Sequence, residues 1–149
     1  RLEFAGRLGA DNTVSIEEHD PESRVKQILQ LTKNRGADVV IEATGNPQAV
    51  SEGMNMARDS GRLVVVGQYT DYGNISINPH SQINKKHLEI RGSWGTDFSH
   101  VYRAVQILSK YGNRFPWADF VTKEFSLSET NEALASVEKL QVVKAVIKP

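Results

Sequence analysis

The sequence has no cysteine, no long apolar run and no net charge, and each absence excludes a class of function. Without cysteine there are no disulfides, thiolate nucleophiles, iron–sulfur clusters or thiolate zinc sites. The longest apolar runs, such as Leu63–Val66, fall far short of the roughly 20 residues that cross a bilayer. Because 18 Lys and Arg balance 18 Asp and Glu, no basic field attracts nucleic acid or membrane surfaces. We therefore expect a soluble, cytoplasmic domain that binds neither nucleic acid nor a membrane surface.

Several motifs that carry chemistry are also missing. The sequence contains no HExxH, no G-x-S-x-G nucleophile elbow, no phosphate-binding G-x-x-x-x-G-K-[ST] and no G-x-G-x-x-G. The four histidines show no metal-ligand spacing: His19, His80, His87 and His100. We therefore predict no catalytic residue and no metal ligand in this chain.

What the first half does contain is an alternation of short apolar runs with helical patterns. Three runs are predicted to be strands, and the last two lack polar alternation, which is typical of strands buried on both faces: 13–16, 38–45 and 63–67. Between them, two helices start at a capping residue followed by proline, Asp20-Pro21 and Asn46-Pro47, and the second is predicted to end at Gly61. This order indicates a parallel sheet with helical crossovers.

The second half has a different rhythm. Residues 68–86 are polar and rich in turn residues, with Ile75 and Ile77 alternating as in a short edge strand. A helix is also predicted over 2–9 at the start of the chain. The remaining predicted elements are a strand over 88–93, a helix from 98 to about 112, a strand over 120–125, a helix over 128–138 and a strand over 142–147.

Small residues stand where three of the predicted parallel strands end: 43–45, 66–68 and 92–95. Ligands of open parallel sheets bind at the carboxyl ends of the strands. Glycine there lets a flat ligand lie against main-chain N–H and C=O groups, or it merely turns the chain out of the strand. Spacing alone leaves both interpretations open.

Six stretches, in order along essentially the whole chain, carry a family resemblance: 1–11, 36–45, 61–67, 90–93, 125–133 and 143–147. Together they resemble the downstream half of a medium-chain dehydrogenase/reductase, in the branch of zinc-containing alcohol, polyol and threonine dehydrogenases. The resemblance implies an α/β fold, namely part of a Rossmann-like doubly wound parallel sheet. Residues 1–94 would be the second part of the dinucleotide-binding domain, and residues 95–149 the C-terminal part of the catalytic domain.

The resemblance also implies that the chain is a C-terminal fragment. The glycine-rich phosphate turn, the zinc ligands and the proton relay of such enzymes would precede Arg1. We therefore expect this chain alone to be inactive, and the family's cysteines to belong to the missing part.

The same resemblance assigns candidate coenzyme-binding residues. Arg1 would approach the adenosine ribose, and Lys144 the pyrophosphate. Main-chain groups after the strands would meet the adenine side (Thr44, Gly45 and Asn46) and the nicotinamide carboxamide (Val66, Gly67, Gln68, Ser93, Trp94 and Gly95). Three of these residues have simpler readings: Lys144 as an outward-facing strand residue, Trp94 as core packing and Arg1 as a disordered chain end.

The implied function is hydride transfer between an alcohol or ketone substrate and NAD or NADP, with zinc in the full-length enzyme. The implied assembly is a homodimer or tetramer, because Asn74–Asn78 falls where these enzymes pair an edge strand with a two-fold copy. Two alternatives remain: a zinc-free quinone or enoyl reductase of the same superfamily, and a non-enzymatic α/β module that binds a nucleotide or a protein.

Overall fold

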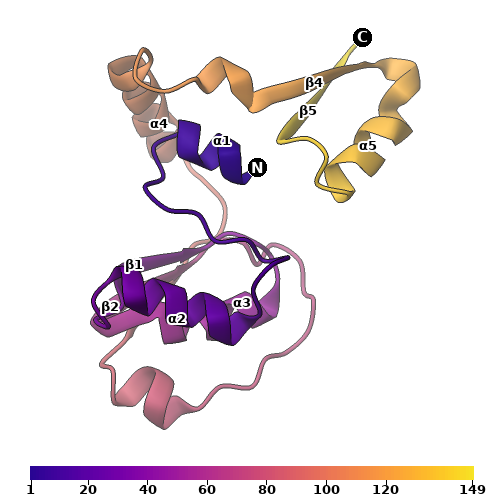
Figure 1. Cartoon of the computed structure of the whole chain (residues 1–149). Helices are drawn as coiled ribbons and strands as arrows, with labels where there is room; N and C mark the ends of the chain where they lie inside the picture. The colour runs from indigo at the N-terminus through magenta and orange to yellow at the C-terminus, as the bar shows by residue number, and fades with distance from the viewer. The chain divides into compact units, whose positions relative to one another are not determined.

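The computed structural model describes all residues, 1–149, as two compact units (Figure 1). The central unit is Val14–Thr96, and the terminal unit combines Arg1–Thr13 with Asp97–Pro149. This grouping differs from the predicted division into 1–94 and 95–149 in where it places Arg1–Thr13. That division concerns a complete enzyme and stays a prediction.

A three-stranded parallel sheet forms the middle of the central unit. Its order is β1-β2-β3, and the bounds are Ala37–Glu42, Ala57–Val65 and Glu89–Gly92. Leu63 of β2 lies in register with Val40 of β1 and with Ile90 of β3. Because all three strands run the same way, their carboxyl ends meet at one edge of the sheet.

Two helices with the predicted caps accompany this sheet. In α2 (Pro21–Leu31) the Asp20 carboxylate accepts a hydrogen bond from the Ser23 N–H at 2.7 Å, and in α3 (Pro47–Met56) Asn46 caps the first turn. α3 packs on β1 and β2, and α2 packs against α3 (Figure 1). Arg24 of α2 and Glu52 of α3 form a bidentate ion pair at 2.6–2.7 Å, which fixes the two helices to each other.

The core of the central unit lies between α3 and the sheet. Leu63 is fully buried and contacts a cluster of Met54, Ala57 and Leu88. The opposite face of the sheet is open, since Val39 and Ile41 are more than half exposed. The prediction that these strands are covered on both faces is therefore wrong within this chain, because α3 packs on one face only and α2 packs against α3.

The helix predicted to end at Gly61 ends earlier, at Met56, and β2 starts at Ala57. The register between β1 and β2 jumps from Ala57 to Arg62, so the intervening residues bulge out of the ladder. Gly61 is needed there, because a Cβ would lie 2.8 Å from the Arg58 carbonyl oxygen. Its role is a close approach of backbone inside a strand, which resembles a helix stop when read from sequence.

Two predicted edge strands do not join the sheet. Residues 13–16 and the segment around Ile75 and Ile77 form no ladder. A strand needs a neighbour, and neither segment pairs with β1 or β3. Burial nevertheless alternates over Asn74–Asn78, with both isoleucines half-buried and the residues between them exposed. The segment η1 (Pro79–Asn84) follows, and its Gln82 amide donates a hydrogen bond to the Ser51 hydroxyl of α3 at 3.0 Å.

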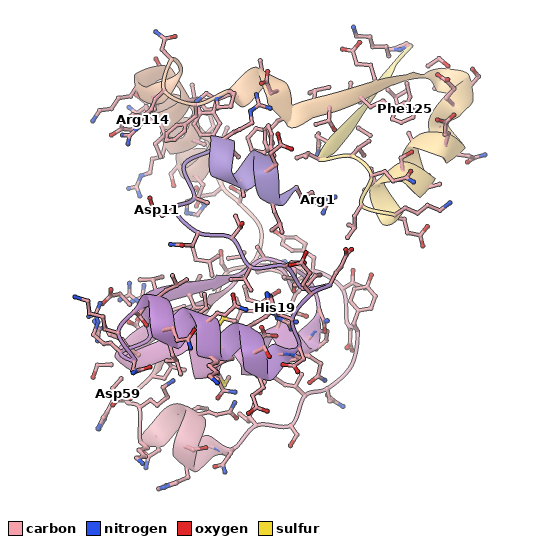
Figure 2. The ribbon with its side chains drawn as sticks, in the orientation of Figure 1. Arg1, Asp11, His19, Asp59, Arg114 and Phe125 are labelled. Carbon is pink, nitrogen blue, oxygen red and sulfur yellow. The ribbon has the colours of Figure 1, made fainter.

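The terminal unit contains the remaining predicted elements. They are α1 (Leu2–Arg7), α4 (Phe98–Tyr111), η2 (Trp117–Phe120), β4 (Val121–Ser126), η3 (Leu127–Glu129), α5 (Thr130–Glu138) and β5 (Lys144–Lys148). β4 and β5 pair in parallel and α5 packs on β5, while Phe125 of β4 is buried (Figure 2). The Phe4 ring of α1 meets the Phe120 ring edge-to-face at 5.1 Å. These contacts hold the two ends of the chain together.

Helix α4 is amphipathic, yet none of its residues is buried. Its apolar side chains, Phe98, Val101, Val105 and Leu108 among them, are all exposed. Capping by Asp97, whose carboxylate accepts the His100 N–H at 3.2 Å, defines its start. None of the helices in the chain has both the length and the apolar character to span a membrane.

Candidate functional site

The candidate site is the edge of the central sheet where β1, β2 and β3 end. Three loops follow these strands: 43–45, 66–68 and 93–95. The in-register pairing of Glu42 with Val65, and of Val65 with Gly92, brings the three loops to the same edge. The predicted residues of the central unit therefore gather in one place.

A buried carboxylate joins the first two loops. Glu42, the last residue of β1, is 3% exposed. Its Oε1 accepts hydrogen bonds from the Thr44 N–H at 2.6 Å, the Thr44 hydroxyl at 2.7 Å and the Gly45 N–H at 3.0 Å. Its Oε2 accepts a longer one, 3.3 Å, from the Gly67 N–H in the next loop. Glu42 thus replaces the water that these main-chain groups would otherwise bind.

These contacts decide the ionisation of Glu42. Burial alone acts to raise the pKa of the carboxyl, but the hydrogen bonds from Thr44 and Gly45 outweigh it and hold the pKa below its usual value. The Gln68 side chain also lowers the pKa of Glu42, although its Nε2 completes no hydrogen bond of normal geometry. Glu42 is therefore a charged group at neutral pH, stabilised by fixed donors.

Glu42 is not among the site residues predicted from the sequence. The available signal was an acidic residue at the end of the apolar run 38–42, where a charge can be buried only if donors surround it. The sequence does not show that those donors come from its own loop and the neighbouring one.

The glycines of the first two loops are required by the loops themselves. A Cβ on Gly67 would lie 2.6 Å from the Gly45 nitrogen and 2.7 Å from the Thr44 nitrogen. Gly45 has a φ of +75°, a conformation that side chains disfavour. Close contact between the loops therefore accounts for Gly67, and a turn accounts for Gly45.

The second loop has two main-chain N–H groups with hydrogen-bond partners and other main-chain groups without any. The N–H groups of Val66 and Gly67 both donate to the Glu42 carbonyl, at 2.9 and 3.0 Å. The Val66 carbonyl and the Gln68 N–H have no protein partner, and the Gln68 Nε2 is buried without one. An unpaired acceptor beside an unpaired main-chain donor is the complement of a primary carboxamide, which offers both an N–H and a C=O group.

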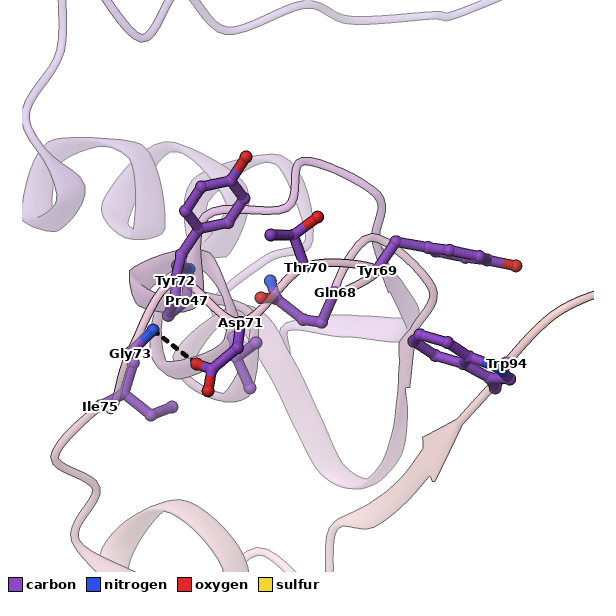
Figure 3. A pocket seen from close by; sticks show the side chains of 10 residues that line it. Pro47, Gln68, Tyr69, Thr70, Asp71, Tyr72, Gly73, Ile75 and Trp94 are labelled. Carbon is purple, nitrogen blue, oxygen red and sulfur yellow. Dashed lines mark hydrogen bonds between the residues drawn. The ribbon is translucent and has the colours of Figure 1, made fainter.

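The third loop is held by an aromatic pair. The Tyr69 and Trp94 rings stack at 4.7 Å between centroids with 16° between planes, and the Tyr69 hydroxyl accepts the Gly95 N–H at 2.7 Å (Figure 3). The Ser93 N–H continues the ladder to the Val65 carbonyl at 3.0 Å. Trp94 is 76% exposed, so its alternative interpretation as core packing is wrong.

A pocket of about 460 Å³ adjoins the second loop (Figure 3). Its walls are mostly apolar or aromatic, with a few polar groups, which is the usual character of a small-molecule site. The lining residues are Pro47, Val50, Gln68, Tyr69, Thr70, Asp71, Tyr72, Gly73, Ile75 and Trp94.

The other predicted residues have defined places. Asn46 caps α3 by accepting the Gln48 N–H at 3.0 Å. Arg1 and Lys144 lie in the terminal unit, where the Arg1 guanidinium donates to the Val142 carbonyl at 3.0 Å and Lys144 begins β5 with an exposed side chain. Arg1 is thus an ordered residue with a partner.

No group of three or more His, Cys, Asp or Glu side chains in the chain could hold a metal ion. The donor set that zinc requires does not fit any position here. No metal-assisted step is assigned to residues of this chain.

The sequence profile of the family described as zinc-binding dehydrogenase matches residues 1–110. The chain belongs to the zinc-binding dehydrogenase family. This confirms the resemblance found in the sequence and the α/β fold that it implied.

Curated members of the zinc-binding dehydrogenase family match nearly the whole chain. It is 34% identical to 5-exo-hydroxycamphor dehydrogenase of Pseudomonas putida, over 99% of this chain and 40% of that protein. It is 31% identical to L-threonine 3-dehydrogenase of Bacillus subtilis, over 100% of this chain and 41% of that protein. The chain therefore spans about 40% of the length of these relatives.

Solved structures agree. The chain matches the crystal structure of an alcohol dehydrogenase from Thermotoga maritima with a TM-score of 0.86 at 30% identity, covering 99% of this chain and 40% of that one. It matches 2R,3R-butanediol dehydrogenase from Bacillus subtilis with a TM-score of 0.78 at 27% identity, covering 99% and 40%.

Proposed function

We propose that this chain forms the nicotinamide-binding part of an oxidoreductase that transfers a hydride between an alcohol or ketone and NAD or NADP. The observation that carries the proposal is the second strand-end loop, where Val66 and Gln68 leave a carbonyl and an N–H unpaired beside a buried Gln68 amide. Membership in the zinc-binding dehydrogenase family supports the same chemistry.

When bound, the nicotinamide ring gives or receives the hydride. The role of this chain is to bind and orient it. The Val66 carbonyl would accept a hydrogen bond from the carboxamide nitrogen, and the Gln68 N–H would donate to the carboxamide oxygen. Glu42 keeps the loop rigid, because its charge is already satisfied by Thr44, Gly45 and Gly67. Such a preset loop loses little entropy on binding.

The remaining predicted residues take the proposed roles that the family resemblance suggests. Thr44, Gly45 and Asn46 would line the adenine side, and Ser93, Trp94 and Gly95 would complete the nicotinamide side. Arg1 would approach the adenosine ribose and Lys144 the pyrophosphate, where a cation offsets phosphate charge. In the longer relatives' architecture, residues 1–94 would belong to the coenzyme domain and 95–149 to the catalytic domain.

We also propose that the chain assembles as a homodimer, or as a tetramer made of two such dimers, through Asn74–Asn78. The main-chain N–H and C=O groups of residues 74–77 form no hydrogen bonds. Ile77 packs against the core of the central unit, while Ile75 lines the pocket. A second copy would satisfy these groups by strand pairing. Sedimentation that shows only monomer at high micromolar concentration would remove this proposal.

The two tryptophans provide a direct test of nicotinamide binding, because one lies in each unit. Trp117→Phe leaves Trp94 as the only indole, next to the proposed site. Adding reduced nicotinamide mononucleotide should then quench Trp94 and sensitise emission from the dihydronicotinamide ring. The matched control, Trp94→Phe, removes the indole at the proposed site and should lose the part of the signal that depends on Trp94. Trp94 emission that stays constant up to millimolar ligand would reject the proposal.

Catalysis is tested separately. Because the chain carries no metal site, the purified 149-residue protein should not oxidise alcohols. A longer protein that contains this sequence together with zinc ligands should do so with NAD or NADP. Turnover by the isolated chain would contradict the proposal that this chain only binds and orients the nicotinamide.

A further inference from the structure

Tyr69 is the only side chain that ties the loop after β2 to the end of the loop after β3. Its hydroxyl accepts the Gly95 N–H at 2.7 Å, and its ring stacks on Trp94 at 4.7 Å. In Figure 3 the two rings lie one above the other, at one side of the pocket that both residues line.

Little else restrains Trp94 and Gly95. The sheet ladder ends with the Ser93 N–H, which donates to Val65. A Cβ on Gly95 would meet nothing within 4 Å, so no neighbouring atom crowds this side of the residue, and its φ of +68° is a conformation that glycine adopts at little cost. Trp94 is largely exposed, so burial does not hold it in place. The orientation of this loop therefore depends on Tyr69.

Tyr69 is itself firmly placed. The Tyr69 N–H donates a hydrogen bond to the Gly67 carbonyl at 2.9 Å. Tyr69 directly follows Gln68, whose main-chain N–H is unpaired. Gly67 in turn is packed against Gly45 and Thr44. A rigid path therefore runs from the Glu42 carboxylate through Gly67 to Tyr69, and from Tyr69 to the third loop.

We propose that Tyr69 is a positioning residue that fixes the loop Ser93–Gly95 relative to Val66–Gln68, so that the two loops present one surface to the nicotinamide. This role rests on the proposed function. Tyr69 does not need to touch the ligand, since it acts by holding the Trp94 ring and the Gly95 N–H. Tyr69 makes two separable contacts that hold the loop: its hydroxyl accepts the Gly95 N–H, and its ring stacks on Trp94.

Two variants separate those contacts. Tyr69→Phe keeps the stack and removes the acceptor, and Tyr69→Leu removes both. Tyr102→Leu is the matched control, because Tyr102 is an exposed tyrosine on α4 in the terminal unit. Affinity for reduced nicotinamide mononucleotide is measured by titration calorimetry on the full chain, with the thermal midpoint of each variant and the Gly95 amide resonance followed by NMR.

Tyr69→Leu is expected to weaken binding about tenfold, since it loses a hydrogen bond and an aromatic contact. Tyr69→Phe should weaken it about threefold, and the control should bind like the parent. The Gly95 amide resonance should move in both Tyr69 variants, while the thermal midpoints stay close to that of the parent. A loss of affinity without a loss of stability marks positioning and not general support of the fold.

Three results would overturn this role, and they are distinguishable. If the parent chain binds reduced nicotinamide mononucleotide and Tyr69→Leu binds it equally well, Tyr69 has no positioning role although the proposed function stands. If the affinity falls only in step with the thermal midpoint, Tyr69 is merely structural. If the parent chain itself does not bind, the proposed function fails and this role falls with it.

Discussion

The central and terminal units differ in how they are held together. The central unit has a continuous core around Leu63, with α3 packed directly on the sheet. The terminal unit buries isolated side chains such as Phe4, Phe125 and Val142, and its longest helix, α4, buries none. One unit is stabilised mainly by its own interior, while the other exposes much of the apolar surface that its helices carry.

This difference matches the distribution of the candidate site. Loops that must hold main-chain groups in fixed positions need a rigid support. The strand ends of the central unit have one, and the buried Glu42 joins two of them. The terminal unit contributes only Arg1 and Lys144 to the predicted residues, and these are single side chains on a less buried framework.

The largest expected effect comes from removing the centre of the core. Leu63→Ala should lower the free energy of unfolding of the central unit by about 3–4 kcal/mol, because it leaves a cavity under α3. Chemical denaturation followed by Trp94 fluorescence in the Trp117→Phe background measures this unit selectively. The control Leu134→Ala, on an exposed position of α5 in the terminal unit, is followed through Trp117 in the Trp94→Phe background and should change the stability of that unit by less than about 0.5 kcal/mol. Equal losses would erase the contrast between the units.

The next effect concerns the contact between the strand-end loops. Gly67→Ala places a Cβ against the Gly45 and Thr44 nitrogens and should cost about 2–3 kcal/mol. Gly92→Ala is the matched control, since a Cβ there meets nothing within 4 Å. Thermal unfolding of both variants, monitored through Trp94, checks the pair. If the two variants melted together, the loops would not be in close contact.

Glu42 links stability to pH. Glu42→Gln should cost about 2 kcal/mol at neutral pH, because an NH2 group then faces an N–H donor. Since the folded-state pKa is lowered, the stability from Glu42 is fully present above the ordinary Glu value of 4.5 and is lost as pH falls through the lower folded value. Unfolding midpoints across acidic pH should therefore fall more steeply in the parent than in the variant. Glu18→Gln, at an exposed carboxylate without hydrogen bonds, should keep the parent's profile.

The smallest expected effect is in α4. Val105→Gln should change the free energy of unfolding by less than about 0.5 kcal/mol, because the side chain is exposed. Binding of a hydrophobic dye should decrease, since the exposed apolar face becomes smaller. A loss of more than about 2 kcal/mol would mean that this face is packed in solution.

Local signals in the sequence were sufficient for the starts of two helices, although not for the end of α3. Asp20-Pro21 and Asn46-Pro47 place the starts of α2 and α3, because a cap and a proline act within one turn of chain. The strands that pair with neighbours in the sheet were found by their apolar runs. Residues 13–16 have the composition of a strand but no neighbour to pair with, and pairing is not encoded locally.

The sequence predicted which edge of the sheet gathers the candidate loops, but not the contacts that hold these loops together. The carboxyl ends of parallel strands indicated where the loops would gather. That Glu42 satisfies donors from two loops, and that Tyr69 reaches Gly95, depends on contacts between distant segments. Gly61 shows the same limit, since it looked like a helix stop and instead allows two backbones to approach inside β2.

The terminal unit is assembled from both ends of the chain, and this has a kinetic consequence. During synthesis, β1, β2 and β3 emerge in the order in which they pair, so the central unit is able to fold while the ribosome is still adding residues. The contact of Phe4 with Phe120, and of Arg1 with the Val142 carbonyl, must wait until the last stretch has been made. A folded central unit shortens the free loop that these contacts close, which lowers the entropy cost of closure. Folding of residues 1–149 is therefore expected to finish with the docking of α1, after the central unit has formed.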